Sequence, residues 1–252
     1  MTHSLATAFP LPRFVLLLVL LAPAAGAAAD EAGDPFDILG FRLGMTAEEV
    51  EAVFRRHNPE IDLQVRHATY RYSDGLRQHE TEPFLDQIAG HLRDPASGST
   101  LHVTVEFSPP PDGGRAVQIL RNDANIPDPV TLAEYRAALI GKYGPPASER
   151  FSPEWHFPAG RSLCSSSANG PVAGNFSTLA QGVDRDQKLA DPSRCASYLV
   201  FRMKGDPVTH VYARMVDVES AIRTHLAASA WVAELEAAAV ERRKAEGRGP
   251  EL

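Results

Sequence analysis

Two segments of the chain share a helical pattern of apolar residues that follows the same start signal. Thr46-Ala-Glu-Glu49 and Thr131-Leu-Ala-Glu134 are capping boxes, in which the threonine and glutamate side chains accept hydrogen bonds from the first backbone N–H groups of a helix. The boxes lie 85 residues apart, and apolar residues at helical spacing follow each one. These are Val50, Ala52, Val53 and Phe54 in the first segment and Tyr135, Ala137, Ala138 and Leu139 in the second. The pattern predicts two helices, which end before Pro59 and near Gly144.

Alternating apolar and polar positions predict two antiparallel hairpins. Residues 101–107 alternate in this way, and the chain returns through residues 117–119 after a turn rich in proline and glycine. Residues 198–204 and 208–216 predict a second hairpin with a tighter turn. Each helix is therefore followed, further along the chain, by a hairpin.

The two halves differ in the residues between helix and hairpin. Both have an early strand candidate, residues 63–72 in the first half and 150–157 in the second. In the first half Pro83 begins a predicted short helix, whose apolar side consists of Phe84, Leu85, Ile88 and Leu92. In the second half residues 161–197 are rich in Ser, Ala, Gly and Asp. A segment of this length without secondary structure is uncommon unless it is cross-linked, disordered or bound to something.

A long helix is predicted over residues 218–244, which are rich in Ala, Glu, Arg and Leu. Ile222 and Leu226 continue one apolar face, but Trp231 follows Leu226 after five residues and is turned by about 140° from it. Either the helix bends at the small residues 227–230, or Trp231 packs on something other than the main core.

Together these elements predict an α+β fold. Two related helix-plus-hairpin units form an antiparallel sheet covered by helices, and a long C-terminal helix follows. The predicted organisation is a signal peptide at 1–29, a first unit at 30–125, a second unit with a disulfide-closed loop at 126–217, and a C-terminal helix and tail at 218–252.

A secretory signal peptide is predicted at the N-terminus. Arg13 precedes an apolar run over residues 14–22, and the small residues 24–29 follow. A membrane span needs about 20 apolar residues, roughly twice this run. We therefore expect cleavage after Ala27 or Ala29, and a soluble protein that is periplasmic or secreted and has no stable membrane anchor.

Export determines how the cysteines are interpreted. Cys164 and Cys195 are the only two, and an oxidising compartment predicts a disulfide between them. Neither has a second cysteine or a histidine within four residues, so the pair does not fit the short ligand spacings of a structural zinc site.

Composition and motifs argue against several classes of function. The chain is 44% hydrophobic and 23% charged with a net charge of −7, which is typical of a globular protein and opposite to the basic surface that nucleic acids require. Ser165-Ser166-Ser167 lacks the Gly-x-Ser-x-Gly frame of a hydrolase nucleophile, and the glycine patterns of nucleotide-binding loops do not occur. No cofactor and no nucleic-acid partner are expected.

One stretch resembles a known family. Phe41-Arg-Leu-Gly-Met-Thr-Ala-Glu-Glu-Val50 is similar to the Leu-Gly-Met-Thr/Ser-x-x-x-Val opening of the small outer-membrane-assembly lipoproteins of the SmpA/OmlA/BamE type. The tandem order of helix and strands also resembles the beta-lactamase-inhibitor-protein-like arrangement. The resemblance implies an envelope binding module, with helices on one side of an antiparallel sheet and no catalytic site. This chain lacks the lipidated cysteine of the lipoprotein family, and no functional residue is carried over.

Aromatic and basic residues suggest a binding surface. Tyr70 and Tyr72 share a strand face with Arg66, and Trp155 and His156 occupy the strand candidate of the second half. Exposed Tyr, Trp and Arg on a sheet resemble the anchor residues of protein interfaces. Packing in the core is the alternative for Trp155.

Three histidines suggest a further hypothesis. His67, His102 and His210 fall in strand candidates, and three imidazoles that meet across a sheet could bind zinc or copper. Solvated or hydrogen-bonded histidines on a polar sheet face are the simpler interpretation, and no metal site is predicted.

The sequence therefore predicts an exported, non-enzymatic module that binds an unidentified envelope protein or peptide across its sheet. The alternatives are a hydrolase with a cleft between the two halves, involving Glu154 or His156 and the 161–197 loop as a lid, and a carrier of a small ligand or metal.

Overall fold

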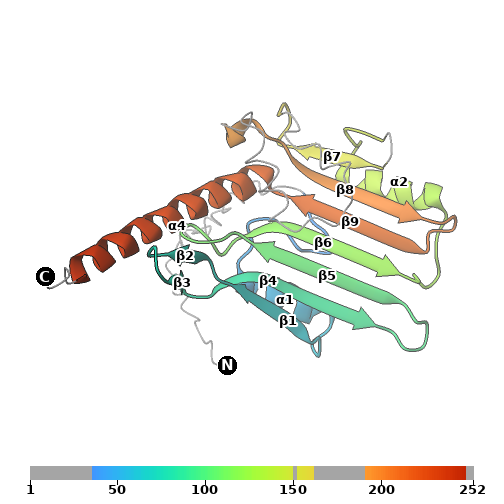
Figure 1. Ribbon diagram of the computed structural model, residues 1–252. Coiled ribbons are helices and arrows are strands. Elements are labelled where there is room, and N and C mark those ends of the chain that lie inside the picture. The colour runs from blue at the N-terminus through green and yellow to red at the C-terminus, as the bar shows by residue number, and fades with distance from the viewer. Residues whose placement is uncertain (1–35, 150–151, 162–190, 248–252) are drawn as a thin grey trace, which may run out of the picture. The chain divides into compact units, whose positions relative to one another are not determined.

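The fold was analysed in a computed structural model that describes residues 36–149, 152–161 and 191–247 (Figure 1). Within them lies a seven-stranded antiparallel sheet in the order β1-β4-β5-β6-β9-β8-β7. Its strands are β1 (Leu63–Ala68), β4 (Phe84–Arg93), β5 (Thr100–Phe107), β6 (Ala116–Ala124), β7 (Glu154–Phe157), β8 (Ser197–Lys204) and β9 (His210–Val216). The remaining elements are the hairpin β2 (Arg71–Ser73) and β3 (Gln78–Glu80), the helices α1 (Ala47–His57), α2 (Leu132–Tyr143) and α4 (Val218–Glu246), and the 3₁₀ turn η3 (Pro192–Arg194). The predicted α+β class, with an antiparallel sheet and a long C-terminal helix, is confirmed.

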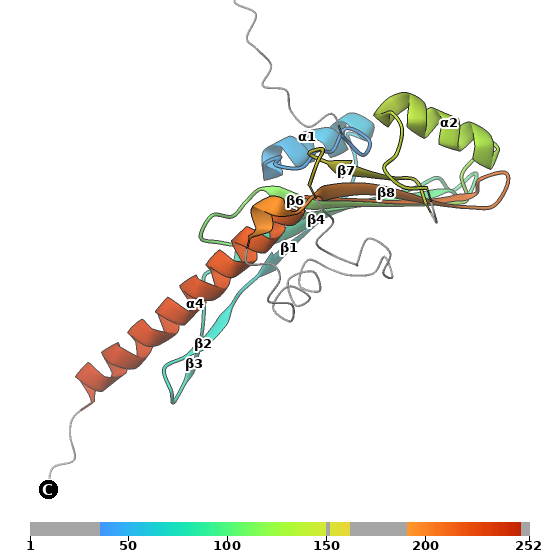
Figure 2. The ribbon, with the colours of Figure 1, turned by 90° about the horizontal axis from the view of Figure 1, so that it is seen from above.

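Helices α1 and α2 lie on the same side of the sheet, which we call the first face (Figure 2). Both begin at the predicted capping boxes: the Thr46 hydroxyl accepts from the Glu49 N–H, and the Thr131 hydroxyl accepts from the Glu134 N–H. In each box the glutamate carboxylate accepts in return from the threonine N–H, at 2.8 Å and 2.9 Å. The two helix starts are confirmed.

The main core fills the space between the first face and these helices. Phe54 of α1 packs directly on β4 at Gly90, where an added Cβ would lie 2.5 Å from the phenyl ring. Glycine therefore allows the helix to approach the strand closely. Buried residues of the sheet complete the core, among them Ile88, Val105, Ile119, Leu199, Phe201 and Met215. In α2 only Leu139 is buried, and Ala138, which the repeat places on the inner face, is exposed.

The short helix predicted from Pro83 is wrong, because residues 84–93 form β4 in the interior of the sheet. Ile88, Gly90 and Leu92 alternate toward the first face, while Ala89 is buried on the opposite side. Apolar residues on both sides of a strand can imitate helical spacing. The segment is a strand here because it pairs with β1 on one side and β5 on the other.

Both predicted hairpins are present, as β5–β6 and β8–β9, and β6 pairs with β9 to join them in one sheet. The strand candidate 63–72 corresponds to β1 followed by β2, and the described end of 150–157 forms β7. These two candidates are not equivalent in the sheet, because β7 pairs with a hairpin strand whereas β1 pairs with β4. The relation between the two halves as a repeat stays a prediction.

Helix α4 starts against the other side of the sheet, the second face, and continues beside the β2–β3 hairpin (Figures 1 and 2). Its first turns pack against β8 and β9 to form a smaller core, which comprises Cys195, Tyr198, Val200, Val216, Val218 and Ile222. Trp231 packs edge-on against Tyr70, with ring centroids 6.5 Å apart, and so lies away from the main core. None of the described helices combines the length and apolar character that a membrane crossing requires.

Several predictions concern residues outside the described ranges. The signal peptide at 1–29, Cys164, Ser165-Ser166-Ser167 and most of the 161–197 loop are among them. Cys195 is fully buried, and the Cys164–Cys195 disulfide stays a prediction.

Candidate functional site

The second face carries a row of buried polar side chains near α4. Glu106, Gln118 and Arg214 lie on β5, β6 and β9 and are 4%, 0% and 3% exposed. The Gln118 amide joins two opposite charges, since its Nε2 donates to Glu106 at 2.9 Å and its Oε1 accepts from two nitrogens of Arg214 at 2.9 and 2.6 Å. Buried charges of this kind require such partners, so this row is fixed in one arrangement.

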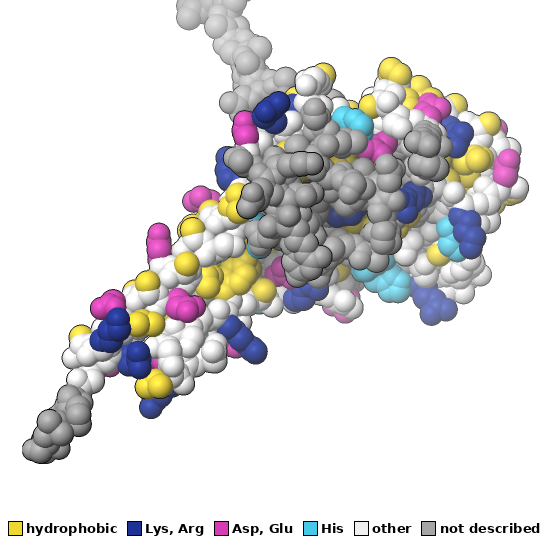
Figure 3. Space-filling view, turned by 45° about the horizontal axis from the view of Figure 1, so that its top comes forward, with side chains coloured by type: hydrophobic (Ala, Val, Ile, Leu, Met, Phe, Trp, Pro, Cys, Tyr) yellow, Lys and Arg dark blue, Asp and Glu magenta, His cyan; other side chains and the backbone are white. Residues whose placement is uncertain are grey.

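Further from α4, the second face becomes basic. Strand register places His91, His102, Asn122, Tyr212 and Arg202 in one row across β4, β5, β6, β9 and β8. The next row consists of Arg93, Thr100, Ala124, His210 and Lys204. Neither row contains a carboxylate. We call Arg93, Arg202, Lys204, His91, His102 and His210 the basic patch, and Figure 3 shows basic and histidine side chains at this end of the sheet.

Burial shapes the titration of this surface. Partial burial lowers the pKa of His102, and the neighbouring His91 lowers it further; the two rings face each other edge-on at 5.9 Å. Burial also raises the pKa of Tyr212 to about 12, so its hydroxyl keeps its proton at neutral pH. The permanent positive charge of the patch therefore comes from Arg93, Arg202 and Lys204.

The predicted binding residues are not brought together. Arg66 lies on β1, where it forms an ion pair with Asp86 of β4, and His156 lies on β7, where its Nε2 is 2.6 Å from Glu154. These are the two edge strands of the sheet, separated by six strand spacings or about 29 Å. Trp155 is 3% exposed and belongs to the main core.

The two predicted tyrosines lie beside the sheet edge rather than on the second face. Tyr70 is half-buried between Phe84 and Trp231, and Tyr72 stacks on His79 in the β2–β3 hairpin. The five residues therefore do not form one surface.

The histidine hypothesis is also changed by the topology. His67, His102 and His210 lie on β1, β5 and β9, none of which neighbours another of the three. Across the described ranges, no three His, Cys, Asp or Glu side chains converge in a way that could hold a metal ion. The histidine that does face His102 is His91, which the sequence pattern does not indicate because its segment resembles a helix.

Two histidines are paired with carboxylates, as in many hydrolases. His156 contacts Glu154 at 2.6 Å and His79 contacts Asp74 at 3.0 Å. Within the described part of the chain, no serine, threonine or cysteine side chain is hydrogen-bonded to either imidazole. Each pair thus offers a base without the adjacent nucleophile that acyl transfer needs.

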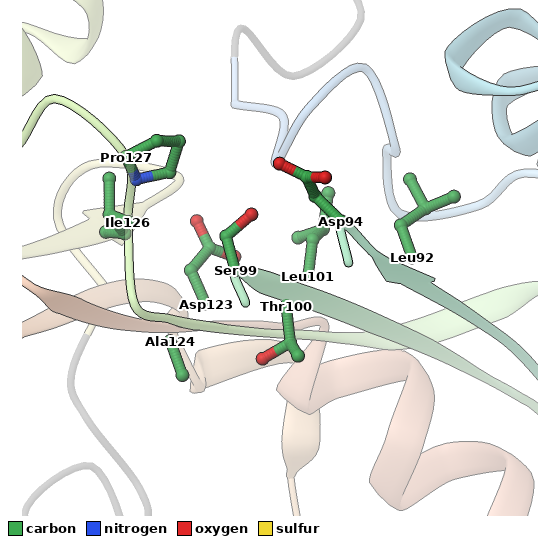
Figure 4. A pocket seen from close by; sticks show the side chains of 9 residues that line it. All are labelled: Leu92, Asp94, Ser99, Thr100, Leu101, Asp123, Ala124, Ile126 and Pro127. Carbon is green, nitrogen blue, oxygen red and sulfur yellow. The ribbon is translucent and has the colours of Figure 1, made fainter. Parts of the chain in front are cut away.

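A hollow of about 200 Å³ lies at the ends of β4, β5 and β6 (Figure 4). Its two carboxylates are already engaged, because Asp94 accepts from the Ser97 hydroxyl and Asp123 accepts from the Arg121 guanidinium. Figure 4 shows Thr100 and Ala124 pointing to the opposite side of the sheet from Asp123. The second face therefore offers more charged side chains for binding a ligand than this hollow does.

Comparison with protein families, curated proteins and solved structures found no match. Function is therefore inferred from the geometry and charge of the described residues.

Proposed function

We propose that the chain is an exported, non-enzymatic binding module that holds an acidic segment of an envelope protein on the second face of its sheet. The observation that carries the proposal is the basic patch, whose two register rows contain six basic or histidine side chains and no carboxylate. The whole chain has a net charge of −7, so this concentration of positive charge is local.

The geometry favours a protein or peptide ligand over a small molecule. Arg93, His91 and Lys204 are exposed, and they are spread from β4 to β8 across the face. Charges distributed over several strands match an extended chain with repeated carboxylates better than a single anion. The exposed Arg93 can bind a carboxylate with two parallel hydrogen bonds, and Arg202 and the half-buried Tyr212 add positive charge and an aromatic ring to the same face.

Two triple variants that remove the same amount of positive charge from different surfaces test the proposal. Fluorescence anisotropy measures binding of a labelled oligoglutamate peptide to the purified protein and to a triple variant, Arg93→Gln, Arg202→Gln and Lys204→Gln. We expect the variant to bind about tenfold more weakly, since the three permanent positive charges of the patch are lost. The control is a second triple variant, Arg42→Gln, Arg136→Gln and Arg223→Gln, which removes the same charge from exposed positions elsewhere.

Ionic strength gives a second readout. Raising the salt concentration from about 0.02 M to about 0.2 M should weaken binding of the peptide to the natural sequence more than to the first triple variant, because screening acts on the charges of the basic patch. Equal losses of affinity in the two triple variants would show that only total charge matters, and the assignment of the second face would then be abandoned.

A further inference from the structure

The β2–β3 hairpin and the end of α4 enclose an open hollow with a volume of about 370 Å³. Its lining comes from two segments far apart in the sequence. The hairpin contributes Asp74, Leu76, Arg77 and His79, and the helix contributes Ala239, Arg242, Arg243, Glu246 and Gly247. This hollow is separate from the basic patch of the sheet.

Asp74 builds the hairpin side of the hollow and is fully engaged there. One of its carboxylate oxygens accepts from the N–H groups of Leu76 and Arg77 at 2.8 and 2.7 Å, and the other contacts Nε2 of His79 at 3.0 Å. The His79 contact and the two N–H groups hold the pKa of Asp74 far below its usual range, so the carboxylate stays charged and bonded. Its oxygens are therefore already occupied by hydrogen-bond donors of the hairpin.

Gly75 brings the turn close to α4. Its φ of +90° favours glycine, and a Cβ at this position would lie 3.4 Å from a terminal nitrogen of Arg243. The guanidinium of Arg243 thus packs over the backbone of the turn. Consequently Arg77 of the turn and Arg243 of the helix face the same hollow.

The three arginines around the hollow have no anionic partner among the described residues. In the part of the chain that the structure describes, no ion pair or side-chain hydrogen bond joins Arg77, Arg242 or Arg243 to a carboxylate. The Nε atom of Arg243 is also buried without a hydrogen-bond partner among these residues, which is unfavourable for a charged donor. Cations are common in the last turn of a helix, but this preference does not account for Arg77, which belongs to the hairpin.

We propose that this hollow binds a phosphate group. Three guanidinium groups face two carboxylates, Asp74 and Glu246, which leaves an excess of one positive charge, and the Asp74 oxygens are already occupied by hydrogen-bond donors. A phosphate monoester carries close to two negative charges at neutral pH, and its oxygens match the paired donors of several guanidinium groups. The phosphate belongs either to a soluble molecule or to a lipid headgroup.

Leu76 distinguishes these two sources. It lies at the rim of the hollow, in the turn between β2 and β3, and is 78% exposed. Beside a headgroup site, this side chain would contact the apolar part of the lipid. A soluble phosphate would make no use of it.

Isothermal titration calorimetry with inorganic phosphate tests the site in the purified protein. Arg77→Gln and Arg243→Gln, which change the two different elements, should each weaken binding on the order of tenfold. Arg71→Gln and Arg223→Gln are matched controls. Arg71 lies on β2 and Arg223 on α4, both are exposed, and neither lines the hollow. Circular dichroism of each variant verifies that the fold is retained.

Co-sedimentation with phosphatidylcholine vesicles, with and without phosphatidic acid, identifies the source of the phosphate. Binding that requires phosphatidic acid and is lost in both Arg77→Gln and Leu76→Ser indicates a lipid headgroup. Binding of inorganic phosphate that Leu76→Ser leaves unchanged, without vesicle binding, indicates a soluble ligand. The proposal is overturned if neither probe binds, or if the control variants lose as much affinity as Arg77→Gln and Arg243→Gln.

Discussion

The two faces of the sheet are made by the same strands but are stabilised in different ways. On the first face, alternate residues are apolar and α1 and α2 cover them. On the second face, the positions between them form the smaller core under α4, a buried polar group joined by Gln118, and the basic patch at the other end. Burial of apolar area, which needs no particular orientation of the groups, stabilises the first face. The polar group on the second face depends instead on hydrogen bonds with defined partners. The first face is thus stabilised mainly by burial, and the polar part of the second face by specific partners.

The largest expected effect is on the first face. Phe54→Ala removes the ring that packs on Gly90 and should lower the free energy of unfolding by about 3–5 kcal/mol, through lost burial and the cavity that remains. Urea denaturation followed by circular dichroism measures this. Val65→Ala is the control, because Val65 is 48% exposed on β1 and its truncation should change stability little. A loss below about 1 kcal/mol for Phe54→Ala would contradict the packing described for α1.

A smaller effect is expected in the buried row of the second face. Gln118→Leu keeps the approximate volume but removes the amide that bonds both Glu106 and Arg214, so we expect a loss of about 1–3 kcal/mol in the free energy of unfolding. Asn122→Leu, on the same strand and face but exposed, should have little effect. If both variants were equally stable in urea, the polar row would contribute nothing beyond an apolar one.

The smallest effect concerns pH. Burial and His91 lower the pKa of His102 in the folded protein, so the unfolded chain binds this proton more tightly. The contribution of His102 to stability is then complete above its ordinary pKa of 6.5 and decreases as the pH falls through that value toward the lower folded pKa. His102→Gln should reduce the slope of stability against pH in this range, and His67→Gln serves as the control. Parallel slopes in the natural sequence and His102→Gln would refute this expectation.

Local signals in the sequence were sufficient for much of the fold. Thr46 and Thr131 have their own bonding partners three residues away, so the helix starts are encoded in four residues each. The hairpins likewise join neighbouring segments. Residues 84–93 could not be assigned in this way, because their strand exists through pairing with β1 and β5, and Gly90 has its role only when Phe54 arrives from α1.

The candidate sites depended even more on tertiary structure. His91 and His102 become neighbours through strand register, and Arg77 and Arg243 through the contact between a hairpin and a distant helix. Strand alternation could have indicated His91 and Arg93 once β4 was recognised. No pattern in the sequence relates Arg77 to Arg243, because no periodicity connects a turn with a helix end.

The β6–β9 pairing at the centre of the sheet has a consequence for the kinetics of folding. Each of the two hairpins can form from adjacent residues, but the ladder between β6 and β9 joins strands from distant parts of the chain. Closing such a long loop precedes any gain from the ladder, so the rate-limiting step should be the docking of two preformed hairpins. Variants at this seam should therefore slow refolding more than variants at the outer strands, even where the loss of stability is the same.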